Sequence, residues 1–384
     1  MVFAWAMGLT HHAHGVDNIQ EVVNLALLRG MVGRKNAGLL PLRGHSNVQG
    51  IGSVGFTPNL KQIIFENLEK RFNICLPRKK GLDTLSCMDF ADQGNFKFAW
   101  NLGGNLFGSN PDSRFSEKAL SKIDFILYMN TTLNQGHFRG RGKTTIVLPV
   151  LARDEESQKT TQESMFSYIR LSDGGKSRHS GPRSEGNIIS GIAMRVLKES
   201  PIKWTEFYQN GNIRTLIGKI IPGFEKMSSI DQTKEEFHIS GRILHSPEFP
   251  TADGRAIFTV CPLPQLSNKT NVDFTFKLMT VRSEGQFNTV VYDNEDRYRG
   301  ADSRDIIFMN PEDIHSIGVH EGGRVAVENE TGILDNQKVM AYPIKMGNVM
   351  MYYPEANILV PREYDNRSLT PSFKSIDVKI TKRS

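Results

Sequence analysis

Apolar and polar positions in the first 30 residues follow the spacing of a strand and then of a helix. Residues 2–9, VFAWAMGL, predict a buried strand, and apolar residues recur with helical spacing over 16–29. Asp17 lies near the start of that helix, where a carboxylate suits the helix dipole, and Gly30 ends it. The chain is therefore predicted to open with a strand, a polar loop and a helix.

The same order recurs further along. FKFAW (96–100), FILYMN (125–130) and TIVLPVL (145–151) predict strands, and RFSEKALSKI predicts a helix between the first two. Strands that alternate with helices favour a mainly parallel sheet covered on both faces, with ligands at the carboxyl ends of the strands. Polar loops stand at those ends, namely THHAHG, GGNLFGSNPD and NTTLNQGH. This coincidence predicts a binding crevice.

The pattern changes at about residue 265, where short alternating strands separated by glycine and proline replace the helices. These strands are VDFTFKLMTV, RDIIFMN, GRVAVENETG, QKVMAYPI, NVMMYYP and SIDVKI, and together they predict a compact β-barrel domain. The region before it, 152–264, predicts helices over 187–198, with Ser184 as a candidate cap, and over about 203–220.

Composition narrows the class of protein. The 384 residues suffice for two or three domains, and 39% apolar and 23% charged residues are typical of a globular protein. The net charge of +6 is scattered, and no basic stripe interleaves with aromatic residues, so a nucleic-acid partner is not expected. No apolar run reaches the ~18 residues of a membrane span, and the first residues lack the features of a signal peptide. We therefore expect a cytoplasmic protein without a membrane span.

Two motifs are set aside as metal or nucleotide sites. His11, His12 and His14 have no acidic or thiol ligand nearby, which favours a hydrogen-bonding loop over a metal site. Gly142-Lys143-Thr144 lacks the upstream glycine of a phosphate loop and precedes a strand. The three cysteines have no metal-binding spacing and are expected to be buried thiols in a reducing compartment; they are Cys75, Cys87 and Cys261.

Three loops carry candidate binding residues. PLRGHSNVQG (41–50) is too polar for a core strand and too rich in glycine for an ordinary solvated helix. GGNLFGSNPD (103–112) has glycines that let backbone N–H groups approach a phosphate. TVRSEGQFN (280–288) closes a barrel strand, and a surface ion pair between Arg282 and Glu284 is its simpler interpretation. The same Arg-Ser-Glu-Gly sequence at 183–186 precedes a helix, which favours capping.

Five segments in order resemble the C-terminal half of a molybdopterin oxidoreductase, and most of all the formate-dehydrogenase-like alpha subunits. They are WAMGLTHH, LRGMVGRKNAGLLPLRGHSNVQG, NLGGNLFGSNPD, LMTVRSEGQFNTVVYDNEDRYRG and the pair YYPEANILVP and TPSFKSI. The resemblance covers essentially the whole chain. It implies α/β cofactor-binding domains with parallel sheets followed by a C-terminal double-psi β-barrel. It also implies a bis-molybdopterin guanine dinucleotide cofactor with molybdenum, and oxidation of a small anionic substrate such as formate by two-electron transfer.

The resemblance implies three domains and a set of site residues. Residues 1–45 would end an α/β dinucleotide-binding-like domain, 46–264 would form a second α/β domain, and 265–384 a β-barrel that binds the molybdopterin dinucleotide. Arg43 resembles the arginine that faces substrate, and no metal ligand is expected in this chain. His45 stands where formate dehydrogenases commonly have glutamine. The residues that resemble cofactor contacts are Gly8, Thr10, Gly44, Asn47, Gln49, Gly50, Gly104, Asn105, Asp112, Thr280, Arg282, Ser283, Gln286, Asn288, Asn357, Phe373 and Lys374.

Family members run about twice this length. The N-terminal half, which would carry the molybdenum ligand and any iron–sulfur cluster, is expected on another piece of sequence, and the chain alone is expected to be inactive. That half or an electron-transfer subunit would be its partner. The alternative is a non-catalytic molybdopterin-binding remnant or an interaction module.

Overall fold

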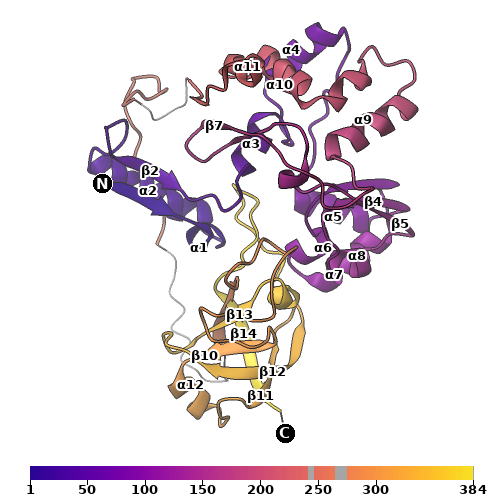
Figure 1. Ribbon diagram of the computed structural model, residues 1–384. Helices are drawn as coiled ribbons and strands as arrows, with labels where there is room; N and C mark the ends of the chain where they lie inside the picture. The colour runs from indigo at the N-terminus through magenta and orange to yellow at the C-terminus, as the bar shows by residue number, and fades with distance from the viewer. Residues whose placement is uncertain (241–245, 264–274, 384) are drawn as a thin grey trace. The chain divides into compact units, whose positions relative to one another are not determined.

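The computed structural model describes residues 1–240, 246–263 and 275–383 (Figure 1). These residues form two compact units, each built from segments that are not consecutive in the chain. The first unit contains residues 1–6, 23–83 and 148–258, and the second contains residues 7–22, 84–147 and 259–384. The predicted boundary at 264/265 lies outside the described residues, and the division into three domains stays a prediction.

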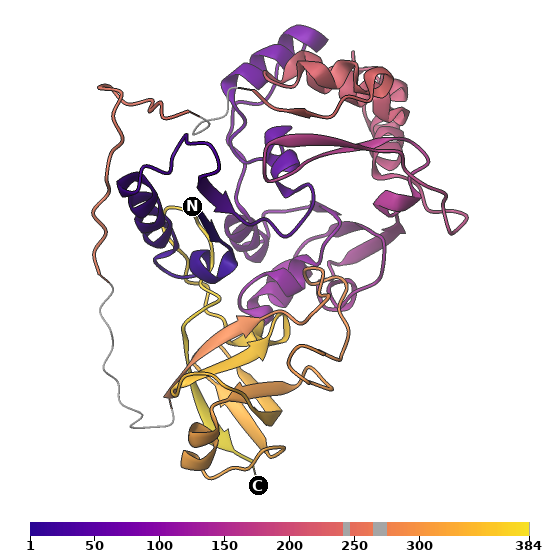
Figure 2. The ribbon, with the colours of Figure 1, turned by 60° about the vertical axis from the view of Figure 1, so that its left-hand side comes forward.

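A closed barrel of six strands forms the C-terminal part of the second unit (Figure 2). Its strands follow the order β10-β12-β11-β14-β9-β13, with both parallel and antiparallel neighbours. Alternate side chains point inward, so that Leu278, Val325 and Val349 are fully buried. The elements are β9 (Thr275–Val281), β10 (Ile306–Met309), α12 (Pro311–Ser316), β11 (Arg324–Glu328), β12 (Ile333–Ala341), β13 (Asn348–Tyr352), η4 (Glu355–Leu359) and β14 (Ile376–Lys382).

The same unit contains a three-stranded sheet of order β3-β4-β5, in which β3 and β4 are parallel. Five of the six residues of β4 are buried, and Ile126 and Tyr128 pack against Leu120 of a covering helix. Burial on this scale is typical of a strand inside a parallel sheet. The elements are α1 (Met7–Thr10), α2 (Gly15–Leu28, with 23–28 in the first unit), α5 (Thr84–Asp92), β3 (Phe98–Leu102), α6 (Leu106–Ser109), α7 (Ser113–Ser121), β4 (Phe125–Asn130), α8 (Gly136–Arg139) and β5 (Thr144–Pro149).

The first unit has two small sheets. β1 and β2 are parallel, whereas β6, β7 and β8 form an antiparallel sheet, and Ile230 is a fully buried residue of its helical core. The elements are β1 (Val2–Trp5), β2 (Gly38–Pro41), α3 (Val48–Ser53), α4 (Gln62–Phe72), η1 (Arg153–Glu155), β6 (Thr160–Glu163), β7 (Tyr168–Ser172), α9 (Glu185–Val196), η2 (Trp204–Tyr208), α10 (Asn210–Ile220), η3 (Glu225–Ser228), α11 (Ile230–Thr233) and β8 (Phe237–His238). No helix in the described part of the chain is both long and apolar enough to span a bilayer.

The predicted fold class, parallel α/β sheets followed by a double-psi β-barrel, is confirmed. The predicted strand 125–130 coincides with β4, and the predicted helix 16–29 is α2. The Ser184 hydroxyl caps α9 by accepting a hydrogen bond from Asn187 N at 3.3 Å. The barrel strand predicted over VDFTFKLMTV is described from Thr275 onward, and its first residues lie outside the described part.

The predicted strand over 2–9 is wrong beyond Trp5, because residues 7–10 form α1. Met7 and Leu9 are 39% and 41% exposed, so the apolar run is no sign of burial there. Strand and helix cannot be told apart by a short apolar run alone. The predicted strand 96–100 is likewise displaced, since β3 occupies Phe98–Leu102.

The stretch 41–50 is also only partly a loop, because α3 begins at Val48. The Asn47 side chain precedes this helix but does not cap it, and its Oδ1 accepts a hydrogen bond from Glu163 N at 3.0 Å. A Cβ at Gly50 would lie 2.1 Å from the same Oδ1, so a side chain at this position would displace the Asn47 amide. The helix therefore depends on a contact with β6, 116 residues further along the chain, which local composition does not reveal.

Candidate cofactor site

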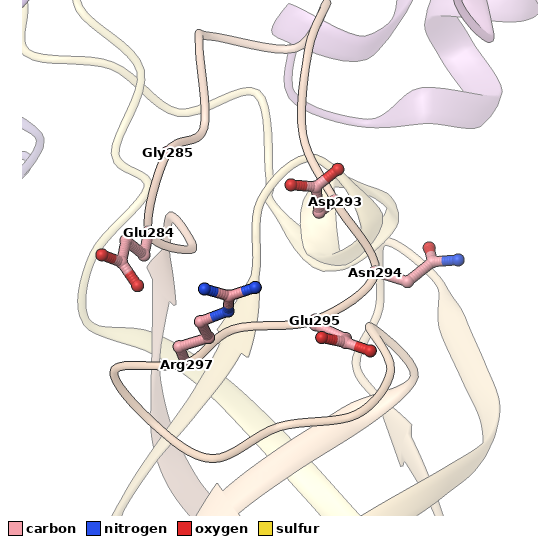
Figure 3. Close-up of a pocket in the computed structure, with 6 residues that line it drawn as sticks. All are labelled: Glu284, Gly285, Asp293, Asn294, Glu295 and Arg297. Atoms are coloured by element: carbon pink, nitrogen blue, oxygen red, sulfur yellow. The ribbon is translucent and has the colours of Figure 1, made fainter.

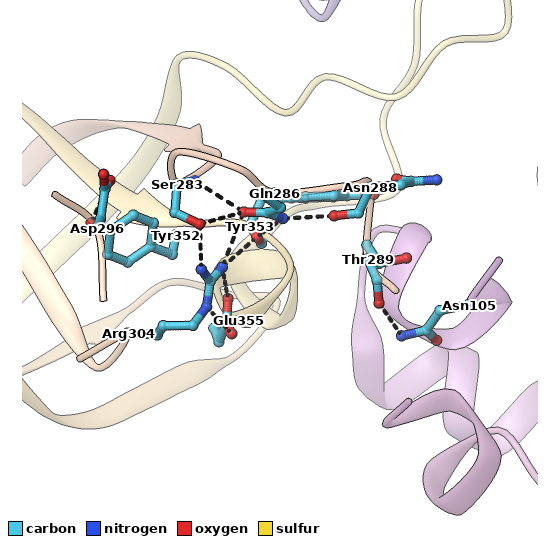
Figure 4. A network of polar contacts seen from close by, with 10 residues as sticks. All are labelled: Asn105, Ser283, Gln286, Asn288, Thr289, Asp296, Arg304, Tyr352, Tyr353 and Glu355. Atoms are coloured by element: carbon cyan, nitrogen blue, oxygen red, sulfur yellow. Dashed lines mark hydrogen bonds and ion pairs between the residues drawn. The ribbon is translucent and has the colours of Figure 1, made fainter. Parts of the chain in front are cut away.

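The loop that follows β9 is held in shape by one buried arginine (Figure 4). Arg304, only 7% exposed, binds Glu355 through two nitrogens at 2.7 and 2.9 Å and donates to the Ser283 hydroxyl at 2.9 Å. Its remaining hydrogen bonds reach Tyr353 O at 2.8 Å and Gln286 Oε1 at 3.3 Å. We call Arg304, Ser283, Gln286, Tyr353 and Glu355 the Arg304 network.

Aromatic rings enclose the same guanidinium, which lies 4.3 Å from the ring centroid of Tyr292 and 4.8 Å from that of Tyr352. An arginine that is paired and stacked in this way stabilises the loop, and its donors are not available to a ligand. Sequence reasoning treated Arg304 only as the start of a strand. The available signal was a positive charge two residues before the buried run that starts at Ile306, since a charge so close to buried residues needs a partner.

The network changes how two predicted cofactor contacts are interpreted. Gln286 Nε2 donates to Asn288 O and Tyr353 O, both at 2.7 Å, and its Oε1 accepts from Ser283 N at 3.0 Å. The side chains of Ser283 and Gln286 are thus occupied within the protein. They fix the path of the loop, and the loop's backbone and Arg282 remain the groups able to contact a ligand.

A second group of basic residues lies where the loop after α1 meets the barrel. Lys374 N donates to His11 O at 3.1 Å, and the His11 ring packs 5.4 Å from the ring of Phe373. Lys374 Nζ donates to Thr280 O, and the Arg282 guanidinium lies 5.4 Å from the centroid of the Tyr353 ring. We call His11, Arg282 and Lys374 the cationic cluster.

Burial and mutual repulsion perturb this cluster. Burial is the main cause that lowers the pKa of His11 to about 4, and the charges of Lys374 and Arg282 lower it further. Burial, followed by the charge of Arg282, lowers the pKa of Lys374 to about 8. At neutral pH His11 is therefore neutral, while Arg282 and Lys374 are two positive charges held together.

The cluster fits an anion. In the described part of the chain neither Arg282 nor Lys374 forms an ion pair with a carboxylate, and Arg282 has only a 3.5 Å contact with Asn288 Oδ1 besides its aromatic neighbour. Two half-buried cations without an acidic partner repel each other, and an anion between them would relieve that repulsion. A pyrophosphate or a pterin oxygen has the required charge, so these residues fit part of a molybdopterin dinucleotide.

Gly8 and Thr10, predicted as cofactor contacts, lie in α1 beside the cluster's histidine. Gly8 O contacts His12 Nε2 at 2.9 Å, and an added Cβ at Gly8 would meet no atom within 4 Å. Gly15 behaves differently, because a Cβ there would lie 2.4 Å from Thr10 O. The loop therefore turns tightly at Gly15 and leaves the backbone at Gly8 open.

The carboxyl ends of β3 and β4 form a second polar area in the same unit. Gly104 has a positive φ of 73° and open space at its Cβ position, and its carbonyl accepts from Asn130 at 2.8 Å and Asn134 at 3.2 Å. Asn130 Oδ1 and Thr289 Oγ1 are buried and have no hydrogen-bond partner among residues 1–240, 246–263 and 275–383. Unsatisfied buried acceptors beside an open glycine are a suitable surface for a base or ribose.

Three other predicted contacts serve mainly in structure. Asn105 caps α6 by accepting from Gly108 N at 2.8 Å and donates to Thr289 O at 3.1 Å, as Figure 4 shows for the second bond. Asp112 caps α7 by accepting from Phe115 N at 3.0 Å. Asn357 is fully buried and donates to Gly108 O at 2.8 Å, although its Oδ1 has no partner within the residues that the structure describes. These residues hold the sheet and barrel parts of the second unit together.

The remaining predicted residues belong to the first unit. Arg43 and Gly44 are exposed in the loop after β2. Gln49 Nε2 donates to Glu163 Oε1 at 2.7 Å and to Ser167 Oγ at 3.1 Å, so its amide, like that of Asn47, orders the segment 47–50 against β6 and β7. Among these residues of the segment 43–50, Arg43 is the charged one, and it is exposed to solvent.

Glu284 lines a cavity of about 620 Å³, and this cavity is not suited to the anionic cofactor that fits the cationic cluster (Figure 3). Three carboxylates line it together with a single arginine; the lining residues are Glu284, Gly285, Asp293, Asn294, Glu295 and Arg297. Carboxylates repel a pyrophosphate. The predicted alternative of an ion pair between Arg282 and Glu284 is not observed among the described residues, because Glu284 faces this cavity.

Two family models match the chain. Residues 1–158 match Molybdopterin oxidoreductase, and residues 276–377 match Molydopterin dinucleotide binding domain. The second match contains Arg282, Lys374 and the whole Arg304 network. These two segments are thus similar to two domains of molybdopterin oxidoreductases.

Curated relatives extend the comparison. An uncharacterized oxidoreductase of Mycobacterium tuberculosis is 34% identical over 99% of this chain and 51% of its own length, and protein YdeP of Escherichia coli is 31% identical over 99% and 52%. A formate dehydrogenase subunit alpha of Methanocaldococcus jannaschii is 26% identical over 98% of this chain and 57% of its own length. The chain thus spans about half the length of the curated relatives it matches.

Among solved structures, acetylene hydratase from Pelobacter acetylenicus matches 95% of this chain and 54% of its own, with a TM-score of 0.58 and 12% sequence identity. At that identity the likeness concerns the fold alone.

Proposed function

We propose that this chain provides binding surface for a bis-molybdopterin guanine dinucleotide in a molybdenum oxidoreductase that acts on a small anionic substrate such as formate. The observation that supports it most is the cationic cluster, in which Arg282 and Lys374 are half-buried and have no acidic partner in the described part of the chain. Both residues lie in the segment that matches the dinucleotide-binding model.

We assign different roles in cofactor binding to the residues of the second unit. Arg282 and Lys374 attract a pyrophosphate or an anionic pterin oxygen, while His11, neutral at pH 7, offers a hydrogen bond without adding charge. Gly104 and Asn130, at the carboxyl ends of the parallel strands, are proposed to contact the guanosine. The Arg304 network keeps the intervening loop rigid, which lowers the entropy lost on binding.

Arg43 is proposed to hold the substrate. Its planar guanidinium can bind a carboxylate through two hydrogen bonds, and it is exposed and forms no ion pair within the described residues. When bound, a molybdenum centre with two pterin dithiolenes supplies the exchange of two electrons with substrate. The protein's contribution is to orient the anion, since orientation alone can lower the barrier by several kcal/mol.

The cofactor proposal is tested on protein purified from its own host. Mass spectrometry of released material should show a guanine nucleotide and a pterin degradation product, with molybdenum in elemental analysis. Arg282→Gln should reduce all three together, whereas Arg297→Gln, which changes an exposed arginine of the same loop, should not. Folded wild-type protein that contains none of the three contradicts the proposal.

A non-catalytic molybdopterin-binding module is the alternative, because the chain spans 51% of a relative that is 34% identical to it. We propose that the matched region is the C-terminal half of the family enzyme, and that turnover also needs an N-terminal half or an electron-transfer subunit. The chain alone, mixed with formate and a viologen dye, should then give no dye reduction. Robust reduction by the chain alone contradicts this, and molybdenum that stays absent even with the other half supplied favours a remnant.

A further inference from the structure

Arg153, the first residue of η1, contacts the loop that carries Arg43 in the first unit. Its Nη1 donates to the Ser46 hydroxyl at 3.1 Å and to Gln162 Oε1 at 2.6 Å. Ser46 lies 107 positions before Arg153 in the sequence but directly follows the stretch from Arg43 to His45. An extended chain spans at most roughly 3.6 Å per residue, so the Cα atoms of Arg43 and Ser46 are no more than about 11 Å apart. The two arginines therefore belong to one small area of this unit.

The hydrogen bonds of Arg153 leave most of its guanidinium available. A guanidinium has five N–H donors, and the two on Nη1 are used by Ser46 and Gln162. Nε and Nη2 form no hydrogen bond with any residue in 1–240, 246–263 or 275–383. Together they present a flat edge of two parallel donors, whose spacing matches the two oxygens of a carboxylate. The bonds of Nη1 orient this edge in the absence of any ligand.

The acidic residues next to Arg153 in the sequence do not neutralise it, because another arginine pairs with them. Asp154 accepts hydrogen bonds of 2.9 and 3.2 Å from Arg178, and Glu155 Oε1 lies 3.0 Å from Arg178 Nε. Arg153 and Arg43 are both exposed, and within the described part of the chain neither forms an ion pair. Two cations in one area without an acidic partner attract an anion from solvent.

We propose that Arg153 is a second anion-binding residue, which holds a small carboxylate together with Arg43. Arg43 contributes an exposed charge, whereas Arg153 contributes a two-donor edge that Ser46 and Gln162 orient. An arginine that is held in place by the protein loses less side-chain entropy when it binds a ligand. The inference rests on the proposed function, because it adds a residue at the substrate position proposed for Arg43.

Formate binding to the full chain tests this proposal. The arginine Nε–H signals of the 15N-labelled chain are followed by NMR while formate replaces chloride at constant ionic strength. The signals of Arg43 and Arg153 should shift together with one Kd. The signal of Arg170, an exposed arginine on β7 that lies 3.7 Å from Glu236, should not shift. An Arg153 signal that stays unchanged overturns the proposal, and so do different Kd values for Arg43 and Arg153.

Three variants separate the oriented edge from the effect of charge alone. Arg153→Gln should raise the Kd for formate at least 5-fold. Ser46→Ala keeps both charges but removes one bond of Nη1, so it should raise the Kd 2- to 4-fold. Arg170→Gln is the matched control and should leave the Kd within 1.5-fold, and circular dichroism checks that all three remain folded. Equal effects of Arg153→Gln and Arg170→Gln would show that only net charge matters and would overturn the proposal, whereas an unchanged Kd in Ser46→Ala would contradict the orienting role of Nη1.

Formate binding and cofactor content are separate measurements. The formate titration uses the chain without added cofactor, and molybdenum is measured in protein purified from its own host. A chain that binds formate through both arginines but contains no molybdenum fails the proposed function and satisfies this inference. A chain that contains the cofactor, but whose Kd for formate is unchanged by Arg153→Gln, supports the proposed function and overturns this inference.

Discussion

Arg304 and Arg282 both belong to the barrel segment, but they differ in how many partners their guanidinium groups have within the protein. Arg304 is buried with a carboxylate, a hydroxyl and two tyrosine rings around it, so every part of its guanidinium has a partner within the protein. Arg282 lies beside a second cation and has no acidic partner among the described residues. The difference teaches that a buried charge with all its partners shapes the protein, whereas a half-buried charge without them is available to a ligand.

The largest effect on stability is expected for Arg304→Met. It leaves Glu355 without its cation and Ser283 without a donor, and we expect the free energy of unfolding to fall by about 3–5 kcal/mol. Denaturation followed by near-UV circular dichroism measures it. The double variant Arg304→Met with Glu355→Gln should recover part of the loss, and a stability within 1 kcal/mol of wild type would refute the structural role.

The pH dependence of stability tests whether His11 of the cationic cluster is buried in its neutral form. His11 has a pKa of about 4 when folded and 6.5 when unfolded, so the unfolded chain binds more protons between these values. The free energy of unfolding should therefore fall as pH drops from about 6.5 toward 4, by up to about 3 kcal/mol, with no contribution from His11 above that window.

The control is His11→Gln, which should flatten this slope. Burial also lowers the pKa of His12 and of His137, so part of the slope should remain in the variant. An identical pH profile for variant and wild type would show that His11 is not the group responsible.

Arg282→Gln should behave unlike the change at Arg304. Stability should change by less than about 1 kcal/mol, while the Kd for pyrophosphate, measured by calorimetry, should rise at least ~10-fold, or roughly 1.4 kcal/mol. Arg297→Gln is the matched control and should leave the Kd unchanged. A large loss of stability with unchanged binding would reverse the roles assigned to the two arginines.

The smallest expected effect is on one histidine. Lys374→Met removes the positive charge that lowers the His11 pKa most, so this pKa should rise by roughly half a unit. NMR titration of the ring protons follows it. Arg282→Gln should raise the same pKa by less, and an unchanged or lower pKa in Lys374→Met would show that these residues do not interact.

The sequence by itself determined the fold class and most regular elements. β4, α2, α9 and the barrel strands follow from hydrophobic periodicity, which depends only on neighbouring residues. Resemblance also pointed to the segments that carry Arg282 and Lys374. The kind of cofactor was predictable in this way because the motifs lie in fixed order along the chain.

Only the tertiary structure decided what each side chain does. Gln286, Asn105 and Asp112 are predicted cofactor contacts, a prediction that stands untested, and the structure adds a role for each within the protein: Gln286 orders a loop, Asn105 caps α6 and Asp112 caps α7. His11 and Lys374 are 363 positions apart in the sequence, and neither is unusual until folding buries both beside Arg282. Charge, burial and distance are joint properties of residues far apart in the chain, and local patterns carry no information about them.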